Sequence, residues 1–370
     1  MYHILSYFFR DNKYRRATKI FKDPIKVNLE DLKELPLINI IIPAWKEGKI
    51  FEECLLSITK LSYPNLKVIV NAGGNDETIE IANSFRKEEK FLILNQKPGG
   101  KMKALNECLK FVKEGIIYSI DADVFLTDEV LLRMIYPIIN LNEDVVVSGV
   151  KPLKFQENKH LVKYILISRY PHFKVKFSRY GRTQISGPNT CFRSVIYSKI
   201  GKFEEDNYFP ESDRFRGLQI ISKGYKIFQL IDYRSFIYTF YPDSIKSYIS
   251  QELRWRKNKI EKLFYKKSII LTLKMTFLFF LSFFIVISPV LIFFNMWVLL
   301  IALLLFFNKY LKKIRQVLFF NLVVEKKYFP KFGFFFFIKT LFFIYLEELM
   351  TVYLLFSLIF SRKEVPTSII

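Results

Sequence analysis

Cysteine and histidine are scarce in this chain, with three residues of each among 370. The cysteines, Cys54, Cys108 and Cys191, are far apart and odd in number, which argues against a disulfide framework and against a Cys-x-x-Cys site. The histidines lack the spacing of metal ligands. We therefore expect the three cysteines to be buried and to behave as apolar residues.

A secretory signal is also missing, because the N-terminal residues mix aromatic side chains with Arg and Lys and contain no uninterrupted apolar segment. Residues 1–35 are interpreted as a basic and aromatic arm. That arm is either a helix at a membrane interface or a helix packed on a soluble domain. Internal repeats and low-complexity linkers are absent, apart from a bias toward Phe.

Acidic residues are outnumbered, 35 against 57 Lys and Arg, so the net charge is +22. This balance suits nucleic acid, an anionic membrane surface or a polyanionic substrate. The 40 Phe residues are concentrated near the C-terminus, in long apolar stretches that exceed the roughly 20 residues needed to cross a bilayer. We therefore expect an integral protein of the cell membrane that contacts membrane lipids and binds no nucleic acid.

The apolar stretches predict a membrane domain over 261–370. The first stretch is long enough for a hairpin that turns near Ser288-Pro289 or Asn295. The basic stretch 308–332 should stay in the cytoplasm, on the same side as the basic stretch 254–267. The last stretch carries three charged residues, so it either crosses with these facing protein or water, or lies tilted in the interface. The predicted spans are about 269–288, 289–307 and 333–360.

Residues 36–260 are predicted to form an α/β domain. Short apolar runs alternate there with amphipathic stretches of helical period, which implies βαβ units and a mostly parallel, Rossmann-like sheet. In such sheets ligands bind beyond the carboxyl ends of the strands. The predicted strands are 38–42, 66–70, 91–94, 116–120 and 145–149, and the predicted helices are 47–60, 77–87, 101–113 and 127–140.

The most informative stretch is Asp121-Ala122-Asp123, which follows the apolar run 116–120. On a strand, residues i and i+2 point to the same face. Two carboxylates so placed repel each other unless a cation lies between them. Mg²⁺ and Mn²⁺ prefer carboxylate and phosphate oxygens, so the pair Asp121 and Asp123 is the predicted metal site.

The order of motifs resembles that of family 2 glycosyltransferases with the GT-A fold. The similarity covers roughly 36–260, and its last motif, Gln-x-x-Arg-Trp, is also similar to that of membrane-embedded members such as cellulose, chitin and hyaluronan synthases and ceramide glucosyltransferase. The motifs occur here as Ile40–Glu47, Gly100–Asn106, Asp121–Asp123, Gly187–Arg193, Pro210–Asp213 and Gln251–Trp255.

The resemblance implies a nucleotide-sugar donor, a UDP-sugar being the expected one, and a divalent metal ion on Asp123 that also contacts the diphosphate. Family members often carry acidic residues after the second strand, where Asn71 and Ala72 stand here. Asn71 and Asp76 are therefore the candidates for base recognition. The complete set of implied donor-binding residues is Pro43, Ala44, Glu47, Asn71, Asp76, Lys101, Asp121, Gln251 and Arg254.

The resemblance also implies one carboxylate as general base, at a fixed distance before a Gly-Tyr pair, here Gly224-Tyr225. Counting back selects Asp213, with Glu211 as the alternative if the loop shifts. Trp255 would supply a flat wall for the acceptor, together with Gly187 and Asn189.

The sequence therefore predicts an inverting membrane glycosyltransferase that transfers a sugar to a lipid acceptor at the cytoplasmic face. Roughly three spans look too few for a polysaccharide pore, although a processive synthase with a glycan acceptor is the alternative. A non-catalytic basic scaffold would explain the charge but not the ordered acidic residues. A nucleotidyltransferase would use paired Asp residues but leaves Gln-x-x-Arg-Trp without a role.

Overall fold

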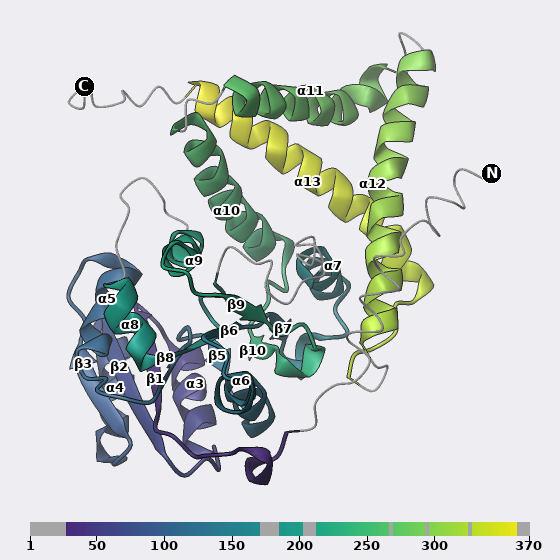
Figure 1. The fold of residues 1–370 in the computed structure, drawn as a ribbon. Helices are drawn as coiled ribbons and strands as arrows, with labels where there is room; N and C mark the ends of the chain where they lie inside the picture. Colours follow the sequence, from purple (N-terminus) through teal and green to yellow (C-terminus); the bar gives the residue numbers. More distant parts are fainter. Residues whose placement is uncertain are drawn as a thin grey trace. The chain divides into compact units, whose positions relative to one another are not determined.

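The computed structural model describes residues 27–170, 185–202, 212–265, 269–291, 293, 296–324 and 328–360. The described chain divides into two compact units (Figure 1). The first takes the described residues up to Lys154 and from Tyr170 to Tyr241. The second takes Phe155–Arg169 and the described residues from Pro242 onward. Residues 155–169 and 242–260 thus join the helical unit, whereas the predicted boundary at 260 placed them with the sheet.

The first unit is built on a seven-stranded sheet in the order β3-β2-β1-β4-β8-β6-β9. The four strands at one end of this order run parallel, as the βαβ pattern predicted. Each agrees with its predicted range to within three residues. These strands are β1 (Ile38–Trp45), β2 (Leu66–Gly73), β3 (Phe91–Asn95) and β4 (Ile116–Ser119).

Helices cover both faces of the sheet, which is why its central strands read as continuous apolar runs. Along β1, Ile40 and Ile42 pack on one face, against α3, α4 and α6. Ile41 packs on the other face, against α5, α8 and α9. These helices are α3 (Lys49–Thr59), α4 (Asp76–Ser84), α5 (Gly100–Leu109), α6 (Asp128–Asn140), α8 (Ser194–Ile200) and α9 (Ser212–Ser222).

Buried cysteines belong to these same layers. Cys54 and Cys191 lie in the first apolar cluster and Cys108 in the second, and all three are free and buried. This confirms the prediction that they act as apolar side chains.

The far part of the sheet was not predicted, apart from the strand at 145–149. There β8 lies antiparallel between β4 and β6, and β6 pairs in parallel with β9. A second sheet has the order β5-β10-β7. The strands are β8 (Thr190–Arg193), β6 (Val145–Val147), β9 (Ile227–Gln229), β5 (Val124–Phe125), β10 (Ile237–Thr239) and β7 (Val150–Pro152).

The second unit consists of helices. Within it α13 contacts all four other helices, and α12 also contacts α7. Buried charges join three of the helices, because Glu348 accepts a hydrogen bond from Ser282 and pairs with Lys309 at 2.5 Å. The helices are α7 (His160–Arg169), α10 (Ile245–Tyr265), α11 (Ile269–Leu291), α12 (Met296–Val323) and α13 (Phe334–Phe360).

The predicted spans differ from these helices. α11 continues through Pro289 to Leu291, so the predicted turn at 288–289 is wrong, and α12 extends to Val323 through the basic residues after 308. Counting only described residues, no helix has the length and apolar character needed to cross a bilayer. The predicted spans at about 269–288, 289–307 and 333–360 are therefore not confirmed.

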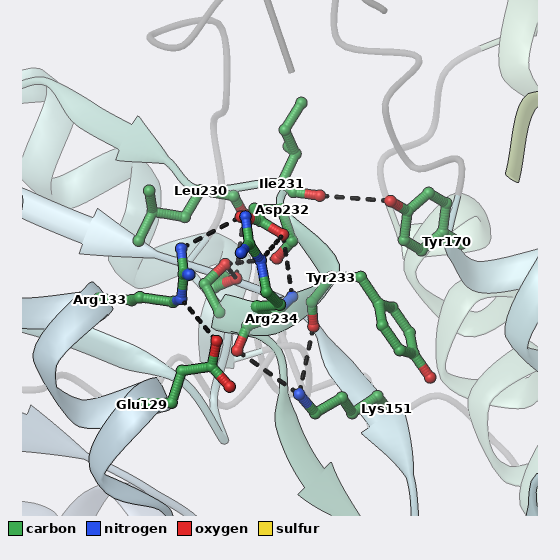
Figure 2. Close-up of polar contacts among 11 residues, drawn as sticks. Glu129, Arg133, Lys151, Tyr170, Leu230, Ile231, Asp232, Tyr233 and Arg234 are labelled. Atoms are coloured by element: carbon green, nitrogen blue, oxygen red, sulfur yellow. Dashed lines mark hydrogen bonds and ion pairs between the residues drawn. The ribbon is translucent and has the colours of Figure 1, made fainter. Parts of the chain in front are cut away.

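A network of charges and hydrogen bonds in the first unit fixes the turn between β9 and β10 (Figure 2). Asp232 Oδ2 lies 3.2 Å from Arg133 Nη1 and 2.9 Å from Arg234 Nη2. Lys151 Nζ donates to the carbonyl of Tyr233 at 3.3 Å. Both arginine side chains are at most 9% exposed, so Asp232 neutralises cations that have little access to water.

We predict that Asp232→Ala lowers the free energy of unfolding by about 3 kcal/mol, because it leaves Arg133 and Arg234 buried without that carboxylate. The matched control is Glu129→Gln, since Glu129 pairs with the same Arg133 but is 49% exposed. The control should cost less than about 1 kcal/mol. Denaturant titrations of both variants measure the difference. If both variants lost the same free energy of unfolding, the burial of the ion pair would not determine how much it stabilises the protein.

Candidate functional site

The Asp121–Asp123 motif lies in a turn after β4. The last sheet hydrogen bond of β4 runs from Ile120 N–H to the carbonyl of Ile41, and the strand itself ends at Ser119. The premise that the two carboxylates share one face of a strand is therefore wrong, because the strand ends before them and the chain turns at residues 122–123. The turn is held from the second sheet, where the Thr239 hydroxyl donates to the carbonyl of Asp123 at 3.2 Å.

Lys101, in the first turn of α5, forms an ion pair with Asp121. Burial lowers the pKa of Lys101, but the carboxylates of Asp121, Asp213 and Asp123 more than offset this and hold that pKa above its usual value. The ammonium is therefore the cation of an acidic site. Lys101 thus lies beside the Asp121–Asp123 motif, and its contact with the phosphates or base of the donor stays a prediction.

Glu47 belongs to the same acidic cluster. Burial raises the pKa of Glu47, and the charges of Asp123 and Asp121 raise it further. Burial, followed by the charge of Asp121, also raises the pKa of Asp123, to about 6. Glu47 follows β1 and the Asp pair follows β4, and these strands are parallel neighbours. Their carboxyl ends bring the three carboxylates close enough to perturb one another.

Asp213 lies in the first turn of α9 and reaches the same cluster. The Gly187 N–H donates to Asp213 Oδ2 at 2.9 Å. A Cβ built on Gly187 would lie 2.9 Å from both Asp213 Oδ2 and Lys101 Nζ. Gly187 therefore allows the ammonium and the carboxylate to approach the same point. The alternative base, Glu211, lies outside the described residues.

The turn that carries Gly187 is anchored by Asn189, which is fully buried. Asn189 Nδ2 donates to the carbonyls of Gly149 and Ser235, and Asn189 Oδ1 accepts from the Tyr118 hydroxyl at 2.8 Å. Every polar group of this side chain is thus engaged inside the protein. Asn189 therefore has a structural role in this turn, and its contact with the acceptor stays a prediction.

Four further predicted donor contacts lie at the ends of β1 and β2. Pro43 and Ala44 are in β1, the first partly exposed and the second buried. Asn71 is 2% exposed and donates to the carbonyl of Ala104 in α5, so it fastens a helix to the sheet. Asp76 is exposed at the start of α4, where a negative charge favours the helix.

Gln251, Arg254 and Trp255 lie on α10 in the second unit. Arg169 of α7 engages two of them, because its Nη2 donates to Gln251 Oε1 at 2.5 Å and its guanidinium lies 4.3 Å from the centre of the Trp255 ring. Arg254 is exposed. These contacts show how Gln251 and Trp255 are held within the helical unit.

Two contributors were missed at the sequence level. Thr239 is far from Asp123 in the chain, and no motif signals their hydrogen bond. Lys46 adopts a left-handed backbone with φ 58°, directly before Glu47. A polar residue with positive φ beside a motif is a feature of strained functional turns, but sequence alone does not reveal it.

A metal ion at this site would need ligands beyond the protein. In the described parts of the chain, no group of three or more His, Cys, Asp or Glu side chains could hold a metal ion. Burial first and the charge of Asp121 second raise the pKa of Asp123, and a dication beside both carboxylates would offset this unfavourable charge. The two Asp carboxylates therefore fit a cation that is also bound by an anionic ligand such as a diphosphate.

Comparison with known proteins agrees with this geometry. Residues 39–201 match the model of the family described as Glycosyl transferase family 2. Poly-beta-1,6-N-acetyl-D-glucosamine synthase of Staphylococcus epidermidis is 30% identical over 100 residues, which are 26% of this chain and 24% of that protein. Glycosyltransferase GlyG of Streptococcus pneumoniae is 27% identical over 116 residues, 30% of this chain and 38% of that protein.

Among solved structures, a mannosyltransferase from Pyrobaculum calidifontis in complex with GDP-Man and Mn²⁺ has a TM-score of 0.55. It is 14% identical, and the match covers 98% of both chains. That likeness shows the fold alone. The chain spans between about a quarter and two fifths of the two curated relatives above. The family match thus lies mostly within the sheet unit and covers less than half of this chain, and the likeness to the solved structure is one of fold.

We predict that Gly187→Ala reduces glycosyl transfer at least tenfold, because its Cβ displaces either Asp213 or Lys101. Stability should change by less than about 1 kcal/mol, since the far ends of flexible side chains can move. Gly201→Ala is the converse control, because φ is +81° there and no atom of the described residues lies within 4 Å of the added Cβ. The free energy of unfolding of that variant should fall by about 1 kcal/mol, and its activity should not change. Loss of activity in both variants would contradict the assignment.

Proposed function

We propose that this chain is an inverting, metal-dependent glycosyltransferase that transfers a sugar from a nucleotide-diphosphate sugar to a lipid acceptor at the cytoplasmic membrane face. One observation carries the proposal: Asp121, Lys101, Gly187 and Asp213 meet beyond the end of β4. An acidic pair, a cation and an oriented carboxylate are the groups that displacement of a diphosphate requires.

In the proposed reaction Asp213 accepts the proton of the acceptor hydroxyl. The hydroxyl oxygen then forms a bond to the anomeric carbon while the bond from that carbon to the diphosphate oxygen breaks. The Gly187 N–H holds Asp213 Oδ2, so the carboxylate keeps its orientation before transfer. A UDP-sugar remains our preferred donor, and Arg254 is proposed as a further cation for its diphosphate.

Asp121 and Asp123 are proposed to hold Mg²⁺ or Mn²⁺ together with the donor. The ion would neutralise charge on the departing diphosphate. The cluster of carboxylates supports this assignment. Burial and neighbouring carboxylates raise the pKa values of Asp123 and Glu47, and a cation would stabilise their charged forms. The Pyrobaculum mannosyltransferase, whose fold is similar, was solved with GDP-Man and Mn²⁺.

Membrane attachment and the lipid acceptor are supported by the helical unit. Large apolar side chains stand exposed on its helices, including Phe277, Trp297 and Phe334, which are 68%, 73% and 75% exposed. Such extensive apolar exposure is characteristic of a surface that contacts lipid or another protein. Trp255, 42% exposed, is proposed as the acceptor wall of the same unit.

We expect membranes that contain the protein to transfer label from one of a panel of UDP-sugars and GDP-sugars into the organic extract. Asp213→Asn should reduce this transfer roughly 10²-fold or more and leave donor affinity within a few-fold, because the amide cannot accept the proton. Glu107→Gln, an exposed position that pairs with Lys110, is the charge-matched control. Label in insoluble polymer would favour a processive synthase instead.

The same assay tests the register of the base. A dead Glu211→Gln variant beside an active Asp213→Asn variant would move the base by two residues. A protein that binds no nucleotide sugar and transfers none would be a scaffold, and the proposed function would be wrong.

We also predict that Asp123→Ala weakens the Mn²⁺-dependent binding of UDP or GDP at least tenfold, because it removes one of two carboxylates that fit the ion. Isothermal titration of each nucleotide, with and without Mn²⁺, measures the effect, and Glu107→Gln should bind as the wild type does. Full glycosyl transfer in excess EDTA would eliminate the metal role.

A further inference from the structure

Lys101 lies at a helix position where a positive charge is unfavourable. It lies in the first turn of α5, where the helix dipole repels a cation. The acidic site compensates, because the Lys101 ammonium pairs with Asp121 and is only 35% exposed. The surrounding carboxylates hold its pKa above the usual value despite burial. The ammonium is therefore a fixed charge of the site.

The same ammonium also lies near Asp213. A Cβ on Gly187 would be 2.9 Å from Lys101 Nζ and 2.9 Å from Asp213 Oδ2, so both atoms surround one point. Lys101 thus stands between a carboxylate of the proposed metal site and the carboxylate of the proposed base. A dication that binds Asp121 must approach this ammonium, and two cations on one carboxylate repel each other.

We propose that Lys101 is an internal counterion that competes with the divalent metal for Asp121. Metal binding then requires the ammonium to leave Asp121, and the diphosphate of the donor supplies the oxygens that receive it. The metal ion alone binds weakly, and the metal with a nucleoside diphosphate binds cooperatively. Because linkage is reciprocal, each ligand strengthens the other by the same factor. This inference rests on the proposed function. It makes Lys101 the positioning residue that causes the metal ion and the nucleoside diphosphate to bind together.

The test is the affinity of the purified full-length protein for Mn²⁺ alone, measured by the electron paramagnetic resonance of free Mn²⁺. Lys101→Met should bind Mn²⁺ about tenfold more tightly than the wild type, since the competing charge is gone. Addition of UDP or GDP should then raise Mn²⁺ affinity less than it does in the wild type. Lys101→Arg keeps the charge and should stay within about twofold of the wild type.

Lys103→Met is the matched control. Lys103 lies on the same helix, its ammonium contacts the carbonyl of Pro98 at 3.3 Å, and the side chain is exposed. The variant removes the same charge from the protein without touching Asp121, so its Mn²⁺ affinity should not change. If Lys101→Met and Lys103→Met gained Mn²⁺ affinity equally, the gain would come from the change in net charge, and the proposal would be overturned.

The double variant Lys101→Met/Asp121→Asn separates competition from other causes, because it removes the contested carboxylate. Its Mn²⁺ affinity should fall below that of the wild type. If this double variant still bound Mn²⁺ more tightly than the wild type, the proposal would be wrong. If Lys101→Met does not unfold cooperatively, Lys101→Gln takes its place, because it keeps a hydrogen-bonding group without the charge. Unchanged Mn²⁺ affinity in the folded variant also overturns the inference.

The two proposals fail separately. If the wild type transfers sugar but the loss of Lys101 leaves Mn²⁺ affinity unchanged, only the counterion role is wrong. If the wild type transfers no sugar but Lys101→Met tightens Mn²⁺, the competition is real and the glycosyltransferase reaction is the assignment that falls.

Discussion

Repulsion among carboxylates at the end of one parallel sheet is the constraint on which this site depends. The pairing of β1 with β4 brings Glu47, Asp121 and Asp123 to one edge, where partial burial raises the pKa of Glu47 and of Asp123. Negative charges so placed need a cation. Lys101 provides one, and it does so from the beginning of a helix, which is an unfavourable place for it. The ion pair with Asp121 therefore offsets the unfavourable effect of the helix dipole on Lys101 in the first turn of α5.

The second requirement of the proposed reaction is a base that keeps its orientation, and a main-chain N–H orients Asp213, the proposed base. Asp213 accepts from the Gly187 N–H, and the turn around Gly187 is fastened by Asn189 and Tyr118. Asn189 also ties this turn to the carbonyls of Gly149 and Ser235. Ser235 donates to the carbonyl of Asp232, so hydrogen bonds connect the turn around Gly187 to the ionic network of Figure 2. Buried polar groups that are all hydrogen-bonded give such a turn one conformation.

Local periodicity predicted the part of the fold in which neighbours in sequence are neighbours in space. Strands β1 to β4 and their helices agree with the predicted ranges because each buries a continuous or periodic apolar pattern. β8 and β10 were missed, since their partners are distant in the chain and their few residues carry no period. For the same reason, the burial of Asn189 and the bond from Thr239 to Asp123 were beyond reach. Lys101 and Asp213 were selected mainly from the order of motifs, and the structure brings both side chains to Gly187, whereas their roles stay predictions.

The position of α7 in the chain has a consequence for how the protein is made. α7 is encoded between β7 and β8 of the sheet unit, yet it packs against α12 and α13 of the helical unit. A ribosome that adds roughly 5–20 residues per second needs on the order of ten seconds between completing α7 and starting α12. During that interval the ring of Tyr164 in α7 lacks its final partner, Phe343 of α13, whose ring centre lies 5.0 Å away in the folded protein. Synthesis of this protein therefore depends on protection of one nascent helix until the C-terminal helices emerge.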